Sequence, residues 1–261
     1  MLSQSEVEEF VTDGYVVIRS AVPSDIAEQC RRSAAQQLEI DLERPETWER
    51  PVVRGVPTGA CFKKAANTPT LLEAVSQLVG PDRWQTRRNL GAFVVRFPSE
   101  EDPGDTGWHI DSSFQPSGDS RWFVNYRSKS RALLLLCLLS SVGPEDAPSR
   151  LVPGSHLEMA RLLAPAGETG LPGAYPGQES QIPLPAGKRT PIHATGAAGD
   201  VYVCHPFLVH AASWPHRGNQ PRFIAQPPIS LADAVQLNGP HEQLSPVAKA
   251  IRFGLEESGV S

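Results

Sequence analysis

A histidine and a carboxylate stand two residues apart in the segment 107–112, which reads Gly-Trp-His-Ile-Asp-Ser. In an extended chain, residues i and i+2 point to the same face, so His109 and Asp111 can converge on one small cation. One imidazole and one carboxylate are two of the three ligands in the 2-His-1-carboxylate triad of non-heme Fe(II) oxygenases. Because H-x-D tripeptides are common by chance, a metal site requires a third ligand elsewhere in the chain.

Three histidines downstream are candidates for that third ligand: His205, His210 and His216. His205 and His210 have opposite parity along an extended chain, so both face the same way only if Pro206 introduces a bulge. Parity alone does not choose between them. The alternative for His205 is a hydrogen-bonded core histidine, and the alternative for His216, in a turn-like segment, is a surface loop residue.

Arg222 opens an apolar stretch that follows His210 along the chain. If the two segments formed a hairpin, the guanidinium would return to the neighbourhood of the metal. A guanidinium binds a carboxylate bidentately. This would suit 2-oxoglutarate, whose C5 carboxylate needs such a partner while its other end chelates iron. Taken alone, Arg222 is better read as a surface arginine, but behind a ligand histidine the anchor reading is favoured.

The first 80 residues are expected to be mostly helical. Ser5 and Glu8 have the spacing of a capping box, and the helix that they would start is expected to end near Gly14. Further elements are expected as a strand over 15–18, a helix opening at 23–25, an irregular stretch over 41–60, and a helix from Pro69 with a C-cap at Gly80.

From residue 84 onward the pattern becomes that of strands. They are expected over 92–97, around His109, over the wholly apolar stretch 132–139, over 201–210 and over 222–226. Residues 153–156 are expected to form a turn, and the Pro- and Gly-rich stretch 164–199 is expected to be a lid loop. The predicted fold class is mainly β with flanking helices, built on a double-stranded β-helix (jelly-roll, cupin-like) core over 84–230 within one domain over 1–261.

Composition limits the functions to be considered. The chain has 261 residues and a formal net charge of −5, without a basic block, so neither nucleic acid nor an anionic membrane is an expected partner. No apolar run reaches the roughly 18 residues of a membrane span. The first residues lack a signal-peptide pattern, and the four scattered cysteines indicate free thiols in the reducing cytosol. The sequence does not predict the oligomeric state.

Taken together, the motifs resemble the phytanoyl-CoA dioxygenase (PhyH-like) family of Fe(II)- and 2-oxoglutarate-dependent oxygenases. The matching stretches occur in the family's order and spacing. They are residues 8–18, the H-x-D at 109–111, the segment 143–156 ending in Pro-Gly-Ser-His, the segment 199–210 beginning Gly-Asp and ending in His, and Pro221–Arg222.

The resemblance implies that His210 is the third iron ligand beside His109 and Asp111, and that Arg222 binds 2-oxoglutarate. It also implies, more weakly, that Ser149, Thr106 and Ser213 contact the cosubstrate, and that Phe93 and Leu136 line the pocket. The spacing from His210 to Arg222 is one residue longer than is usual in the family, so Ser213 is displaced from its expected position.

The function that the resemblance implies is oxidation, most simply hydroxylation, of an unactivated C–H bond in a small organic molecule, with 2-oxoglutarate and O2 as cosubstrates of Fe(II). A role in natural-product biosynthesis is expected. The intact Asp111 argues against halogenation, since related halogenases lack this carboxylate. Two other classes stay open, namely a Zn-dependent hydrolase or isomerase with the same ligands, and a non-catalytic binding relative.

Overall fold

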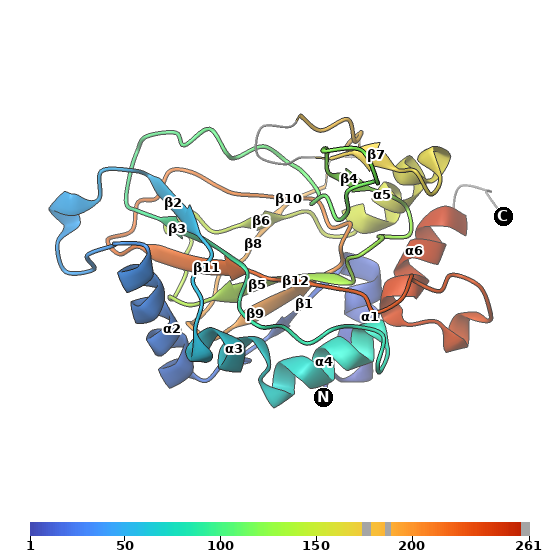
Figure 1. The fold of residues 1–261 in the computed structure, drawn as a ribbon, viewed down its shortest axis with the longest axis horizontal. Coiled ribbons are helices and arrows are strands. Elements are labelled where there is room, and N and C mark those ends of the chain that lie inside the picture. The colour runs from blue at the N-terminus through green and yellow to red at the C-terminus, as the bar shows by residue number, and fades with distance from the viewer. Residues whose placement is uncertain (174–178, 186–188, 257–261) are drawn as a thin grey trace.

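The computed structural model describes residues 1–173, 179–185 and 189–256. Six α-helices lie in this part of the chain: α1 (Gln4–Asp13), α2 (Ser24–Gln37), α3 (Ala60–Ala66), α4 (Pro69–Val79), α5 (Ser155–Leu163) and α6 (Pro246–Glu256). Three 3-10 turns accompany them: η1 (Pro45–Thr47), η2 (Ala164–Ala166) and η3 (His241–Gln243). In Figure 1, α1 to α4 lie along one side of the largest sheet, and the strands β6, β8 and β10 lie on its other side.

The largest sheet has the strand order β1-β9-β5-β11-β3-β2, and β12 also pairs with β5. Its strands are β1 (Tyr15–Ile18), β2 (Val52–Gly55), β3 (Ala92–Arg96), β5 (Leu133–Leu138), β9 (Val201–Cys204), β11 (Arg222–Gln226) and β12 (Pro228–Ile229). A smaller sheet has the order β10-β6-β8, with β10 (His210–Ala211), β6 (Arg150–Leu151) and β8 (Ile192–His193). The short strands β4 (Phe123–Val124) and β7 (Leu171–Pro172) pair separately.

Strand β5 shows how the two layers are held together. All six of its residues are buried, as the apolar stretch predicted. Leu133 and Leu135 belong to the core between the sheet and the helices, whereas Leu134 and Leu136 belong to a second core between the two sheets. Since successive side chains point to opposite faces, a strand that is covered on both faces must be apolar throughout. The predicted fold class, mainly β with flanking helices around a jelly roll, is confirmed.

Several predicted elements need correction. The capping box is formed by Ser3 and Glu6 and not by Ser5 and Glu8, because the helix begins two residues earlier than predicted, and the spacing of the two capping residues is the same. The irregular stretch 41–60 contains η1 and the edge strand β2. The expected turn at 153–156 leads directly into α5, which starts after Gly154. The prediction did not include α6, which packs against α1, α4 and α5.

The predicted single strand over 201–210 is two strands in different sheets. Strand β9 ends at Cys204, a turn contains Pro206, and β10 begins at His210 in the smaller sheet. The parity argument for His205 and His210 therefore does not apply, because no continuous strand joins them. The two segments do not form the hairpin that would bring Arg222 back beside His210, since β11 pairs with β3 and β5, and β10 pairs with β6.

The remaining expectations for the chain are met only in part. The predicted lid over 164–199 contains η2, β7 and β8, and its residues 174–178 and 186–188 lie outside the described residues. The four cysteines, all within the described residues, are free thiols, and Cys30, Cys137 and Cys204 are buried. Among the described helices, none is long and apolar enough to cross a membrane.

Candidate metal centre

His109, Asp111 and His210 come together at one point between the strands. One potential ligand atom from each lies within 4.8 Å of the others. Asp111 Oδ1 is 3.9 Å from His109 Nε2 and 3.8 Å from His210 Nε2. The backbones of the two histidines are joined in both directions, with N–H···O distances of 3.0 and 2.9 Å. His109 sits on this isolated β-bridge and not on the regular strand that was expected.

Both imidazoles are oriented by backbone carbonyls. His109 Nδ1 lies 2.9 Å from the carbonyl oxygen of Gly107, and His210 Nδ1 lies 3.0 Å from that of Leu208. A carbonyl oxygen only accepts, so each Nδ1 must carry the proton in these bonds. The lone pair of each Nε2 is then free on the side that faces Asp111. This arrangement, with the outer nitrogen donating to a carbonyl, is characteristic of metal-binding histidines.

Arg131 holds the carboxylate, and the sequence analysis missed it. Its Nη1 donates to Asp111 Oδ2 at 2.5 Å, and its Nη2 donates to the carbonyl oxygen of Ser112 at 2.7 Å. The oxygen that it contacts is not the one that approaches the histidines. Arg131 directly precedes the buried stretch that becomes β5, where a charged residue is ordinarily a solvent-exposed strand end, so the sequence carried no signal for this contact.

The site favours the charge state that binds a cation. Burial would raise the pKa of the Asp111 carboxyl, but the charge of Arg131 and the two histidines outweigh burial and lower this pKa to about 2. Burial, with a smaller effect from His109, lowers the pKa of His210 to about 4. At neutral pH Asp111 is therefore ionised and His210 is neutral, which is the protonation state that metal ligands need.

Arg150 ties the H-x-D segment to the strand of His210. Its Nε donates to the carbonyl oxygen of Ala212 at 3.0 Å, and its Nη2 donates to that of Thr106 at 2.7 Å. Its guanidinium also lies 4.4 Å from the centre of the Trp108 ring, within the range of a cation–π interaction. One side chain thus links residues just before His109 to residues just after His210.

Arg222 is connected to the metal-ligand cluster by the segment 147–151, which contacts Arg222 at one end and His210 at the other. Its side chain is only 2% exposed and donates from Nη1 to the carbonyl oxygen of Ala147. At the other end of the segment, Leu151 pairs with His210. Ala147 and Leu151 are four positions apart along the chain, so the segment between the two contacts spans at most roughly 14 Å. Arg222 is thus a buried residue near the centre, and the surface reading is wrong.

The weaker cosubstrate candidates surround this same segment. Ser213 Oγ donates to the carbonyl oxygen of Pro148 at 2.6 Å, and Ser149 is buried, with its carbonyl accepting from Ala194 N–H. Thr106 is half-buried and contributes its carbonyl oxygen to Arg150. These contacts support the segment 147–151 and the approach to His109, and whether the hydroxyls touch a cosubstrate stays a prediction.

The two other histidines lie outside the cluster. His205 is buried at 1% exposure, and its Nδ1 accepts the Phe207 N–H at 3.1 Å while its ring packs against His156. It is the core histidine of the alternative reading. His216 was expected on a surface loop if it was not a ligand, but it is 4% exposed, with Nδ1 accepting the Gly218 N–H.

The two residues expected to line the pocket, Leu136 and Phe93, point to opposite faces of the largest sheet. Leu136 points into the core between the sheets, and its place in the pocket lining stays a prediction. Phe93 lies on the opposite face of β3 and packs edge-on against Phe62 of α3, with ring centres 5.4 Å apart. Phe93 therefore belongs to the helix-facing core, because an odd-numbered residue of β3 shares a face with Val95 and not with Arg96.

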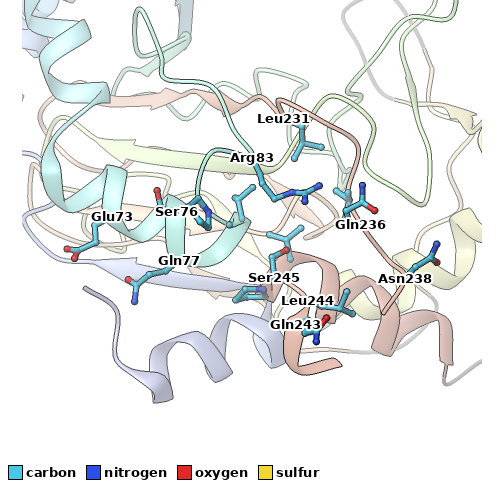
Figure 2. Close-up of a pocket in the computed structure, with 16 residues that line it drawn as sticks. Glu73, Ser76, Gln77, Arg83, Leu231, Gln236, Asn238, Gln243, Leu244 and Ser245 are labelled. Atoms are coloured by element: carbon cyan, nitrogen blue, oxygen red, sulfur yellow. The ribbon is translucent and has the colours of Figure 1, made fainter. Parts of the chain in front are cut away.

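A pocket of about 660 Å³ lies away from the centre (Figure 2). It is bounded by the end of α4, by residues 231–245 and by the start of α6, and polar side chains such as Gln77, Arg83 and Asn238 line it. None of the three clustered residues is among its lining residues. The convergent ligand atoms therefore lie in the cluster of His109, Asp111 and His210 and not in this pocket.

Comparison with known proteins gives a consistent picture. The sequence matches the phytanoyl-CoA dioxygenase (PhyH) family over residues 10–224. No curated protein sequence matches the chain. Among solved structures, HygX from Streptomyces hygroscopicus, crystallised with nickel, 2-oxoglutarate and hygromycin B, is similar with a TM-score of 0.57 and 20% identity, over 88% of each chain.

Two further structures share the fold. SnoK, described as a non-heme alpha-ketoglutarate-dependent carbocyclase from nogalamycin biosynthesis, has a TM-score of 0.50 and 20% identity, over 90% of this chain and 86% of its own. The epimerase SnoN, crystallised with Fe3+, alpha ketoglutarate and nogalamycin RO, has a TM-score of 0.55 and 18% identity, over 87% of this chain and 82% of its own.

Proposed function

Because the chain belongs to the phytanoyl-CoA dioxygenase (PhyH) family, we propose that it is an Fe(II)- and 2-oxoglutarate-dependent oxygenase that acts on a small organic molecule. The observation that carries this proposal is the convergence of His109, Asp111 and His210, with Nε2 lone pairs and a carboxylate oxygen facing one point. Two imidazoles and one carboxylate on one side of a metal are the ligand set of non-heme Fe(II) oxygenases.

The residues present suit the iron. Each histidine donates its Nδ1 proton to a carbonyl, which directs Nε2 inward, and Arg131 engages Asp111 Oδ2 so that Oδ1 remains for the metal. His109, Asp111 and His210 would hold Fe(II). Imidazole and carboxylate donors without a thiolate also suit this ion, and the four cysteines of the chain lie outside the cluster.

The residues near Arg222 suit the cosubstrate. In the described part of the chain, Arg222 Nε is buried without a hydrogen-bond partner, and the Ala147 carbonyl contacts another nitrogen of the same group. A buried guanidinium with an unused donor is costly unless an anion satisfies it. The distal carboxylate of 2-oxoglutarate would supply that acceptor, with bidentate geometry available to it.

When bound, Fe(II) with 2-oxoglutarate and O2 supplies oxidative decarboxylation of the cosubstrate coupled to oxidation of a substrate C–H bond. The chain's own residues orient the participants. Arg222 binds the distal carboxylate, Arg131 fixes the ligand carboxylate, and Arg150 keeps the segment before His109 against the strand of His210. Burial of His210 and Arg222 limits the access of water to both ends of the site.

For the reaction type we infer hydroxylation as the simplest outcome, and for the substrate a natural-product-sized molecule. HygX was crystallised with hygromycin B and SnoN with nogalamycin RO, and SnoK comes from nogalamycin biosynthesis, which supports a small-molecule substrate. SnoK is a carbocyclase and SnoN an epimerase, so product analysis must decide among oxidative outcomes. The intact Asp111 opposes halogenation, which needs a free ligand position for halide.

An anaerobic binding experiment tests the proposal. Fe(II) and then 2-oxoglutarate would be added to the metal-free protein, and the weak visible charge-transfer band of the chelate would be followed in the wild type and in His210→Ala. We expect a band in the wild type that is lost in the variant. His241→Ala is a matched control, because His241 is half-exposed and pairs with Glu256 away from the cluster.

The same additions of metal and 2-oxoglutarate, followed also by thermal unfolding and activity assays, distinguish the oxygenase from the two other functional classes. A Zn-dependent hydrolase or isomerase would bind metal without any band or thermal stabilisation on addition of 2-oxoglutarate, and its activity would survive Arg222→Ala. A non-catalytic relative would show neither metal-dependent stabilisation nor succinate formation. Absence of the band in folded wild-type protein would overturn the proposal.

A further inference from the structure

Two arginines stand directly opposite each other on neighbouring strands. Arg96 of β3 and Arg222 of β11 are register partners, and each is only 2% exposed. Residues that face each other across an antiparallel pair project from the same face of the sheet. Ile224, two residues along from Arg222 on that face, belongs to the core between the sheets. Both guanidinium groups therefore lie on the inner side of the jelly roll.

These two cations have few acceptors. Arg222 donates to the carbonyl oxygen of Ala147, and Arg96 donates from Nη2 to Asp105 Oδ1. Among the described residues, the Nε of each arginine is buried without a hydrogen-bond partner. Asp105 is shared, because the half-exposed Arg54 donates to its other oxygen. Arg96 and Arg54 thus share one carboxylate, whereas Arg222 contacts no carboxylate directly and interacts with Asp105 and Asp146 only electrostatically.

The charged form of Arg222 is disfavoured in this arrangement. Burial, and then the neighbouring charge of Arg96, lower the pKa of the Arg222 guanidinium to about 9. Two like charges held side by side in the interior are unfavourable unless an anion joins them. A carboxylate has two oxygens that accept several hydrogen bonds, and two guanidinium forks can serve both oxygens.

We propose that Arg96 is a second anchor for the distal carboxylate of 2-oxoglutarate, so that Arg96 and Arg222 together form a two-arginine pocket. This inference rests on the function proposed above and adds a residue to it. Neither the motif that contains His109 nor the one that contains Arg222 includes Arg96, and its role follows from the strand register and from the unused donors.

Asp105 has a distinct part in the pocket. It precedes His109 by four residues and accepts from Arg96 of β3 and from Arg54 of β2. Burial would raise the pKa of its carboxyl, but the hydrogen bonds and charges of Arg96 and Arg54 outweigh burial and lower it. Asp105 therefore stays ionised and fixes one end of the Arg96 guanidinium, leaving the Nε–H for a ligand.

A second arginine anchor should affect which 2-oxoacids the site binds. With two buried arginines at the distal end, an oxoacid without a distal carboxylate leaves both sets of donors unsatisfied. Sites built to hydrogen-bond a polar group reject analogues that lack it more strongly than apolar pockets reject extra bulk. The pocket is thus expected to favour dicarboxylic over monocarboxylic 2-oxoacids, with Arg96 contributing part of the preference.

The test compares two oxoacids in the anaerobic Fe(II)-loaded protein. They are 2-oxoglutarate and 2-oxopentanoate, which has the same chelating end and a methyl group in place of the distal carboxylate. Dissociation constants would be taken from the chelate band in the wild type, Arg96→Met and the control Arg54→Met. Arg54 donates to the same carboxylate but is half-exposed, so its removal tests loss of the Asp105 contact alone.

We expect Arg96→Met to weaken 2-oxoglutarate roughly 10- to 100-fold, as for loss of a hydrogen bond to a charged group, without changing the affinity for 2-oxopentanoate or for the metal. Arg54→Met should change either value by less than about 3-fold. Because a buried arginine can be needed for folding, Arg96→Lys is a second variant. It keeps the charge with a single donor group, and it should lose less 2-oxoglutarate affinity than Arg96→Met.

Equal weakening of both oxoacids by Arg96→Met and Arg96→Lys, or no weakening of either, would overturn the second anchor while leaving the oxygenase proposal in place. Failure of the wild type to form a chelate with 2-oxoglutarate would overturn the oxygenase proposal itself. The two failures are therefore distinguishable within one set of titrations.

Discussion

Arg131 binds one oxygen of the Asp111 carboxylate, and the other oxygen faces the two histidines. Arg131 Nη1 is 2.5 Å from Oδ2, whereas Oδ1 lies 3.9 and 3.8 Å from the Nε2 atoms of His109 and His210. With Oδ2 occupied, the carboxylate is directed to offer a single oxygen to a cation. The second Arg131 contact, to the Ser112 carbonyl, fixes the guanidinium on the backbone beside the ligand.

The first prediction concerns this contact. Arg131→Met should weaken metal binding by roughly 10- to 100-fold, because outer partners of metal ligands contribute that much to affinity. The metal affinity of Arg131→Lys should lie between those of Arg131→Met and the wild type, since lysine keeps the charge but cannot bridge Asp111 and Ser112 with a planar fork. Calorimetry with Mn(II) measures the affinities.

The control for this prediction is Arg121→Met. Arg121 also pairs with an aspartate, Asp119, but on an exposed loop. It should leave the Mn(II) affinity unchanged. If Arg131→Met bound Mn(II) as tightly as the wild type, Arg131 would have no part in positioning the carboxylate.

The second prediction concerns Arg150. Arg150→Met removes two hydrogen bonds to carbonyl oxygens and the contact with the Trp108 ring. The free energy of unfolding should fall by about 1–3 kcal/mol. Urea unfolding measures this loss, and Mn(II) affinity should fall as well, because the segments of His109 and His210 lose a shared tie. Loss of stability with intact metal affinity would limit Arg150 to a structural role.

The third prediction separates the two faces of β3. Phe93→Ala should lower the free energy of unfolding by about 3–5 kcal/mol, because it leaves a cavity beside Phe62 in the helix-facing core. In the protein that remains folded, the dissociation constant of 2-oxoglutarate should be unchanged. A variant that folds well but binds 2-oxoglutarate poorly would place Phe93 at the pocket after all.

The fourth prediction is a loss of stability in mild acid. His156 is fully buried, and burial lowers its pKa from 6.5 to about 4, so the folded protein resists protonation there. As the pH falls below 6.5 the unfolded chain takes up the proton first, and stability is lost progressively until about pH 4. The contribution is on the order of 2–3 kcal/mol.

Thermal unfolding of the metal-free protein between pH 7 and pH 4.5 measures this effect. His210 and the buried His205, whose pKa values are also lowered, add to the slope, so the comparison is with His156→Gln. The variant should be less stable at pH 7 but show a shallower decline towards pH 4.5. An unchanged slope would mean that His156 does not titrate in this window.

By itself, the sequence determined much of the fold and the candidate ligands. The unbroken apolar run around Leu135 predicts a strand covered on both faces, and Thr68, Pro69 and Gly80 delimit α4 by local capping chemistry. His109 and Asp111 were identified because short-range spacing decides which face a side chain occupies. For His210, spacing was insufficient, and the resemblance to the phytanoyl-CoA dioxygenase family supplied the choice.

Only the tertiary structure decided what depends on contacts between distant segments. The turn at Pro206 separates β9, which ends at Cys204, from β10, which begins at His210 in the smaller sheet, and no periodicity within the segment could predict this break. Arg131 and Arg96 look like ordinary charged strand ends until folding brings Asp111 beside one and Arg222 beside the other. Their roles arise from pairing across the chain, because hydrogen bonds and burial are properties of the folded interior and not of local sequence.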